Sequence, residues 1–186
     1  MYFHGLDDVG TQVTRVATSR DGIDFVAEPQ ILGRSYMRVF RHAGMVYAMA
    51  MPGIFYRSCD GFRDFETGPT LFNPRMRHAA LLKRDNLLRV FWTQVGDAPE
   101  RILLSHVDLS GDWRSWRESE PVEVLRPELP WEGADAPLVP SVRSTAYGHV
   151  NQLRDPAILE DEGRIYLFYA VAGESGIALA EVLIDG

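Results

Sequence analysis

A repeated pattern constrains this chain more than any other feature. Residues 14–25 and 54–65 share one succession: a strand-like stretch, a Ser-x-Asp-Gly turn and an Asp-Phe pair. Residues 101–113 hold a weaker third copy that ends in Asp-Trp. The three Asp-aromatic pairs are separated by about 40 and 48 residues, a period typical of β-propeller blades. We therefore predict an all-β propeller, in which candidate sites gather where the blades converge on the central channel.

Strand patterns divide residues 1–186 into about three and a half blades of a single domain. Alternating apolar and β-branched residues, separated by Gly, Asn and Asp turns, predict strands, and no segment shows a helical period. The approximate blades are 1–34 (partial), 35–74, 75–126 and 153–186. The two middle blades are each predicted with three strands, at 39–42, 45–51 and 54–57 and at 78–82, 87–94 and 101–106. The last blade has predicted strands at 157–160, 164–171 and 176–182.

Residues 127–152 interrupt this pattern. They contain four prolines and no clear strand. A loop of this length in a compact domain is usually functional or disordered, and its aromatic residues favour an ordered loop. We expect it to lie at the mouth of the channel.

The N-terminal sequence opens inside a strand. Residues 1–6 have a strand pattern, but no turn or strand precedes them, whereas the matching strand elsewhere follows another strand and a tight turn. We therefore expect the chain to lack an N-terminal portion that includes the innermost strand of the first blade.

Composition excludes several classes of partner. The chain is 46% apolar with a net charge of −7, which fits a globular protein and argues against binding to nucleic acid or to an anionic membrane. No apolar run reaches the roughly 18 residues of a membrane span, and no signal peptide is visible, so a soluble, cytoplasmic protein is expected as far as the N-terminus allows. Cys59 is the sole cysteine, which leaves no disulfide framework and no cysteine-based metal site.

The propeller prediction places polar residues at the mouth of the channel. The mouth is formed by the first residues of the innermost strands and by the loops that follow the second strands. Aligned blades place three groups of residues there: Tyr36, His78 and Asp155 at the strand starts, Arg38, Arg77 and Arg154 beside them, and Asp8, Asp97 and Glu174 after the second strands. A ring of carboxylates suits glycoside hydrolysis, which needs one acid and one base or nucleophile. Each carboxylate equally suits a turn cap, and both interpretations stay open.

Asp155 is the strongest single candidate. It opens an innermost strand directly after the long loop, Pro156 fixes an extended entry, and Arg154 favours the ionised carboxylate. His78 holds the equivalent position in the preceding blade. It serves there as a general acid, a hydrogen-bond donor to substrate or a ligand, or else it bonds within the channel.

A second candidate lies in the long loop, at Trp131-Glu132. A tryptophan beside a carboxylate is a typical sugar contact, because the indole stacks on the ring while the carboxylate reaches hydroxyls or the glycosidic oxygen. The alternative is an aromatic anchor that packs the loop down.

These motifs resemble a known group of enzymes. The repeated Ser-x-Asp-Gly turn and residues 154–169 resemble the five-bladed β-propellers of glycoside hydrolase family 43 and its relatives, families 32, 62, 68, 117 and 130. Such enzymes place a base Asp on the innermost strand of the first blade, a second Asp on the next and an acid Glu further on. Some members carry a structural Ca²⁺ in the channel, and no other cofactor is expected.

The resemblance assigns roles residue by residue. Arg154-Asp155-Pro156 is similar to the Arg-Asp-Pro motif of families 32 and 68, where the Asp stabilises the transition state, although that motif lies in the second blade there and in the last blade here. Glu132-Gly133 is similar to the Glu-Gly of the acid-bearing strand in family 43, but lies in a loop. His78 resembles the axial histidine proposed as the acid in family 117.

Together these patterns predict a glycosidase-like propeller that acts on or binds oligosaccharides. The predicted catalytic residues are Asp155, Glu132 and His78, and the predicted substrate-binding residues are Arg154, Arg77, Trp131, Asp97, Glu174, Asp8, Tyr36 and Arg38. Two alternatives remain: a non-catalytic carbohydrate-binding or interaction propeller, and a fragment that forms a homo-oligomer through unpaired blade edges.

Overall fold

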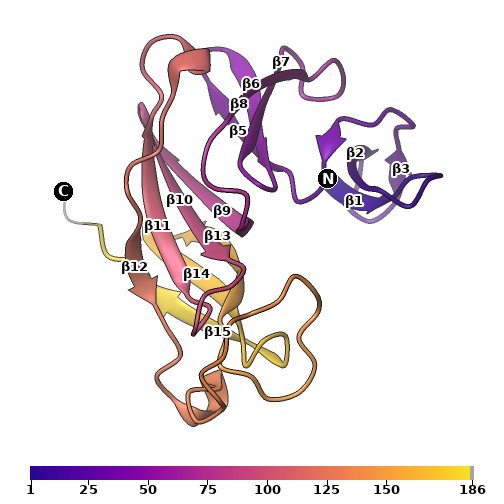
Figure 1. The fold of residues 1–186 in the computed structure, drawn as a ribbon. Coiled ribbons are helices and arrows are strands. Elements are labelled where there is room, and N and C mark those ends of the chain that lie inside the picture. Colours follow the sequence, from indigo (N-terminus) through magenta and orange to yellow (C-terminus); the bar gives the residue numbers. More distant parts are fainter. Residues whose placement is uncertain (185–186) are drawn as a thin grey trace. The chain divides into compact units, whose positions relative to one another are not determined.

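The computed structural model describes residues 1–184 and contains four antiparallel β-sheets (Figure 1). The chain forms two compact units, Met1–Asn73 with Leu109–Arg117, and Pro74–Asp108 with the chain from Glu118 onward. The helical elements described are two 3₁₀ turns of three residues each. None of the described helices has the length and apolar character that crossing a bilayer requires.

The first unit holds two sheets. One consists of β1 (Tyr2–Leu6), β2 (Gln12–Ser19), β3 (Phe25–Ala27) and β4 (Gly33–Arg34), with β4 also paired to β2. The other runs in the order β5 (Arg38–His42), β6 (Met45–Ala50), β7 (Ile54–Ser58) and β8 (Glu66–Thr70). A buried apolar cluster that includes Val16 of β2 and Ala48 of β6 joins the two sheets.

A segment from elsewhere in the sequence completes this unit. Residues 109–117, with the 3₁₀ turn η1 (Trp113–Ser115), pack an aromatic cluster against β5–β8. The ring of Tyr47 lies 5.1 Å from that of Trp116 and 5.7 Å from that of Trp113, and Phe55 meets Trp116 edge-on. Gly68 permits this approach, because a Cβ atom there would lie 2.2 Å from the Trp113 ring.

The Ser-x-Asp-Gly turns form the same hydrogen bonds in both clear copies. Ser58 Oγ accepts from the backbone N–H of Gly61, and Asp60 Oδ1 accepts from the backbone N–H groups of Phe62 and Arg63. Residues 19–24 repeat this arrangement. The backbone N–H of Phe62, followed by the Arg63 side chain, lowers the pKa of Asp60 to about 2.

The second unit also holds two sheets. One runs in the order β12 (Val122–Leu125), β11 (Ile102–Asp108), β10 (Leu87–Gln94) and β9 (Met76–Arg84), and the other in the order β13 (Arg154–Asp161), β14 (Arg164–Val171) and β15 (Gly176–Glu181). Their facing apolar side chains form one core, listed here by its fully buried members: Leu82, Phe91, Ile102, Leu153 and Leu167. The long loop contains the 3₁₀ turn η2 (Pro130–Glu132) and leads directly into β13.

The structure differs from the predicted strand pattern in its outer strands. The middle blades have a fourth strand each, β8 and β12. In the N-terminal sheet, the short strands β3 and β4 pair with the same edge of β2, opposite β1. Their sequences explain the omission, because β4 has two residues, β3 has three, and β8 contains Gly68 and Pro69, which are unfavourable in strands. The described residues therefore form four blade-like sheets rather than three and a half.

The aromatic cluster predicts a strong effect of Trp116. This side chain is 3% exposed, so Trp116→Ala should lower the free energy of unfolding by about 3–5 kcal/mol through lost burial and the cavity left behind. Phe62→Ala is the control, because Phe62 is 48% exposed in the same unit. Urea unfolding followed by fluorescence measures both changes, and equal losses in the two variants would contradict the assignment.

The turn hydrogen bonds predict a defined pH dependence. The folded-state pKa of Asp60 is about 2, below the ordinary value of 3.8, so its stabilising effect is complete above pH 3.8 and is lost as the pH falls toward 2. Asp60→Asn keeps the acceptor oxygen but should flatten the acid slope of stability between pH 4 and 2. Asp8→Asn, in an exposed turn, serves as the control, and an unchanged slope in Asp60→Asn would refute the prediction.

Candidate functional site

The same irregularity opens three of the sheets' first strands. Arg77 pairs with Thr93 and Ala79 with Trp92, so His78 is an extra residue on β9. In β13, Arg154 pairs with Ala170 and the next pair is Ala157 with Phe168, which leaves Asp155 and Pro156 opposite one residue. The residues that lead into β5 have the same extra residue. Ser35 is hydrogen-bonded to Met51 and Arg38 pairs with Met49, so Tyr36 and Met37 lie opposite one residue, Ala50. Such β-bulges bend a strand and re-aim a side chain next to functional sites.

The bulged residues have an uncommon backbone conformation. Tyr36, His78 and Asp155 have φ values of 60°, 40° and 47°, in the left-handed region that non-glycine residues seldom adopt. Each such residue costs on the order of 1–3 kcal/mol and persists only where its surroundings hold it. The three predicted strand-start residues are thus equivalent in structure as well as in alignment.

In the second unit, two of these residues meet. His78 Nδ1 lies 3.2 Å from Asp155 Oδ1, and β9 and β13 are neighbours. The His78 side chain is 9% exposed and that of Asp155 is 39% exposed. A nearly buried imidazole therefore faces a carboxylate that remains open to solvent.

A buried ionic network holds the arginines that immediately precede His78 and Asp155 in the sequence. Glu100 is fully buried and accepts from Arg77, which is 3% exposed: the Nε–Oε1 distance is 2.8 Å, and a second hydrogen bond joins Nη2 to Oε2. The Arg154 guanidinium is also buried, with Nε 3.5 Å from Glu100 Oε2. Two guanidinium groups thus share one carboxylate, that of Glu100. Arginine and glutamate are almost never fully buried unless paired in this way.

The remaining donors of the two arginines are taken up inside the protein. Arg154 donates to Gln152 Oε1, to the backbone O of Ser144 and, at 2.8 Å, to Glu174 Oε1. Arg77 Nη1 donates to the backbone O of Val142. Arg77 and Arg154 therefore act as internal supports in this structure, and Glu174 ties the loop after β14 to the same network.

A pocket of about 350 Å³ opens beside Asp155. Its walls come from β13, β14, β15 and the loop between the last two, and its polar lining includes Asp155, Glu174 and Ser175. Phe168 and Ile177 supply apolar surface. This mixture of two carboxylates and an apolar wall suits a ligand that carries both hydroxyl groups and C–H faces.

Glu132 is held by its own loop and by Tyr169 of β14. Its Oε2 accepts from the backbone N–H groups of Glu128 and Leu129, and Oε1 accepts from the Tyr169 hydroxyl at 3.1 Å. Burial, reinforced by the Glu132 charge and hydrogen bond, raises the pKa of Tyr169 to about 12. Trp131, next in the chain, is 55% exposed. In this geometry the carboxylate anchors the loop, and the indole remains open to solvent.

Asp97 has a comparable role in the loop after β10. Its Oδ1 accepts from Gln94 Nε2 at 2.8 Å, and its Oδ2 lies 3.8 Å from the Arg101 guanidinium. The backbone O of Asp97 accepts from the N–H of Ser141 in the long loop. The carboxylate thus caps its own loop, and the backbone hydrogen bond joins this loop to the long loop.

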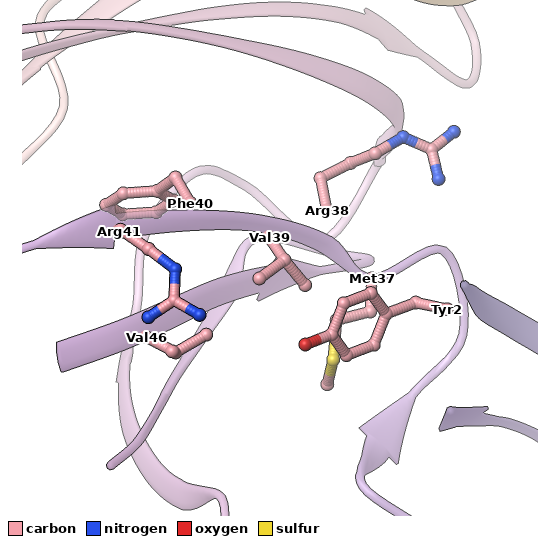
Figure 2. A pocket seen from close by; sticks show the side chains of 7 residues that line it. All are labelled: Tyr2, Met37, Arg38, Val39, Phe40, Arg41 and Val46. Carbon is pink, nitrogen blue, oxygen red and sulfur yellow. The ribbon is translucent and has the colours of Figure 1, made fainter. Parts of the chain in front are cut away.

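The other predicted residues belong to the first unit. The Tyr36 ring lies 4.3 Å from that of His4, and burial, then the charge of Arg38, lowers the pKa of His4. Arg38 lines a pocket of about 590 Å³ with Tyr2, Arg41 and apolar residues, and its guanidinium points away from the Tyr2 ring (Figure 2). Asp8 is exposed in the turn after β1. Among residues 1–184, no group of three or more His, Cys, Asp or Glu side chains is arranged to hold a metal ion.

The Tyr169–Glu132 hydrogen bond gives a direct test of the loop anchor. Glu132→Gln removes the charge, so the pKa of Tyr169 should fall from about 12 toward 10 but remain above 10, because burial is the larger cause. The pKa of Tyr169 is measured from tyrosinate absorbance recorded immediately after a pH jump. Subtracting the same titration of Tyr169→Phe isolates the signal of Tyr169. Glu128→Gln in the same loop is the control, and an unchanged Tyr169 pKa in Glu132→Gln would rule out the contact.

Comparison with known proteins adds one relative in sequence. The chain is 39% identical to the uncharacterized protein R118 of Acanthamoeba polyphaga mimivirus over 201 aligned positions, which include 98% of this chain and 56% of the viral protein. The chain thus spans about half the length of this curated relative. No protein-family model matches the present chain.

Solved structures define the fold. The chain is similar to a β-1,2-mannobiose phosphorylase from Listeria innocua (TM-score 0.59, 14% identity, covering 95% of this chain and 50% of that one). It is similar to a thermostable family-43 glycoside hydrolase (TM-score 0.63, 10% identity, covering 98% of this chain and 67% of that one). A third similar structure is an α-L-arabinanase from Cellvibrio cellulosa (TM-score 0.58, 9% identity, covering 100% of this chain and 70% of that one). These likenesses show that the chain has the all-β propeller fold seen in glycoside hydrolases and related carbohydrate-active enzymes.

Proposed function

We propose that this chain is the carbohydrate-binding part of a glycoside hydrolase-like propeller and that it binds an oligosaccharide at the Asp155–His78 pair. The observation that carries the proposal is the position of Asp155, which is bulged out of β13, partly exposed, lines a pocket and lies 3.2 Å from His78. The fold makes this end of the innermost strands the expected location of a site.

Four residues of the pocket, together with His78, have chemical roles in the proposal. Asp155 accepts hydrogen bonds from sugar hydroxyls or faces the positive charge that develops on the ring during glycoside cleavage. His78 holds the Asp155 carboxylate and supplies or takes a proton. Phe168 and Ile177 cover an apolar face of the sugar, and Glu174 orders the adjoining loop. The crystallised neighbours with mannobiose and arabinohexaose are consistent with such a ligand class.

The proposal places the whole enzyme in a five-bladed architecture in which the upstream part supplies the base. The mimivirus protein and the phosphorylase are each about twice the length of this chain, which is consistent with further structure in the whole protein. Glu132 is the candidate acid by resemblance, and its release from Tyr169 and the loop amides would have to accompany catalysis.

The engagement of Glu132 also favours a second function from another class, a carbohydrate-binding propeller without hydrolytic activity. Both functions use Asp155, but only hydrolysis requires Glu132 to donate a proton. Product analysis after incubation with oligosaccharides separates the two.

The proposal predicts that Asp155→Asn weakens sugar binding. Loss of a charged acceptor costs about 1.5–3 kcal/mol, so the dissociation constant should rise about ten- to hundredfold. Calorimetry with β-1,2-mannobiose, arabinohexaose and a panel of other neutral oligosaccharides measures this change. Asp161→Asn, at the exposed end of the same strand, should bind as the unaltered protein does. Equal affinity of Asp155→Asn, or no binding by the unaltered chain, would overturn the proposal.

A further inference from the structure

A buried charged cluster adjoins the His78–Asp155 pair along the chain. Glu100 is buried between Arg77 and Arg154, and each arginine immediately precedes one member of the pair in the sequence. The peptide bonds from these arginines lead straight into the two bulges. The ion pairs of Glu100 with Arg77 and Arg154 therefore help to position the backbone of the bulges that hold His78 and Asp155.

The cluster is electrically balanced. Arg77 and Arg154 carry two positive charges, and Glu100 and Glu174 carry two negative charges. Glu174 is 35% exposed at its side chain, whereas Glu100 has no exposure, so the Glu100 charge is screened far less by water. Removing the Glu100 charge would leave an excess positive charge on the two arginines that immediately precede His78 and Asp155 in the sequence.

We propose that Glu100 is a positioning residue that sets the protonation state of His78 and thereby the state in which Asp155 meets a ligand. The proposal rests on the proposed function for its consequence in sugar binding. Its effect on His78 is a property of the unliganded protein. The charged groups that bear on His78 come from each surrounding element: Asp155 from β13, Arg77 from β9, Arg154 at the start of β13, Glu100 before β11 and Glu174 after β14.

The direction of the effect follows from electrostatics. A nearby negative charge favours the imidazolium form, and a nearby positive charge disfavours it. Glu100→Gln should therefore lower the pKa of His78, whereas Arg77→Gln should raise it. The double variant Glu100→Gln/Arg77→Gln restores the charge balance and should bring the pKa of His78 back toward that of the unaltered protein.

The test is an NMR titration of the histidine rings, with the His78 signal assigned from His78→Asn. We expect Glu100→Gln to lower the His78 pKa by about one unit and Arg77→Gln to raise it by a similar amount. Glu100→Asp keeps the charge and should remain close to the unaltered value. The matched control is Glu160→Gln, which removes the same group from an exposed pair with Arg84 at the other end of the same two strands, and should leave His78 unchanged.

The outcomes separate this inference from the function on which it rests. Shifts of the same sign in both single variants, or no shift, would overturn the role of Glu100, because a purely structural loss does not follow charge. If Glu100→Gln does not fold, Arg77→Gln and the charge-balanced double variant still decide the matter. Opposite shifts in a chain that binds no sugar would support Glu100 and refute the proposed function. Sugar binding by a chain whose His78 pKa does not change in these variants would support the proposed function and refute the role of Glu100.

Discussion

The structure of the second unit depends on neutralising two arginines in its interior. An isolated buried guanidinium group would cost several kcal/mol, and two close together would also repel each other. A single carboxylate, Glu100, lies between them, and Gln152, Glu174 and loop carbonyls take the remaining donors. Hydrogen bonds from Arg77 and Arg154 to backbone and side-chain oxygens of the long loop therefore hold this loop in place. This arrangement also explains why two arginines far apart in the sequence, at 77 and 154, converge on the carboxylate of residue 100.

The fold was largely readable from the sequence because it repeats. Three innermost strands, their hairpins and the Ser-x-Asp-Gly turns each have a local chemical signature, and the structure contains all of them. The outer strands β8 and β12 were missed, because edge strands are short and lack a strong apolar alternation. The five-blade count and the missing N-terminal portion stay predictions.

The candidate site was readable only in part. Alignment of the strand starts singled out His78 and Asp155, and the structure places them 3.2 Å apart. Glu100 gave no such signal, because its role depends on a partner 54 residues away and on complete burial, neither of which a sequence shows. Glu132 illustrates the opposite problem. By sequence, the Trp131-Glu132 pair fits sugar contact and loop anchoring equally well. In the structure, the Glu132 carboxylate accepts two hydrogen bonds from backbone N–H groups of its own loop and one from Tyr169 of β14.

The bulge at the start of the innermost strands has a consequence for how such a scaffold diversifies. A side chain in a regular strand must suit one face of the sheet, so its replacement disturbs the packing there. The extra residue of a bulge is exempt from that alternation. Tyr36, His78 and Asp155 occupy this position with an aromatic, a basic and an acidic side chain on the same backbone geometry. A propeller built in this way can change the chemistry of one blade in an evolutionary lineage by a single substitution, while the apolar layers between the sheets remain untouched.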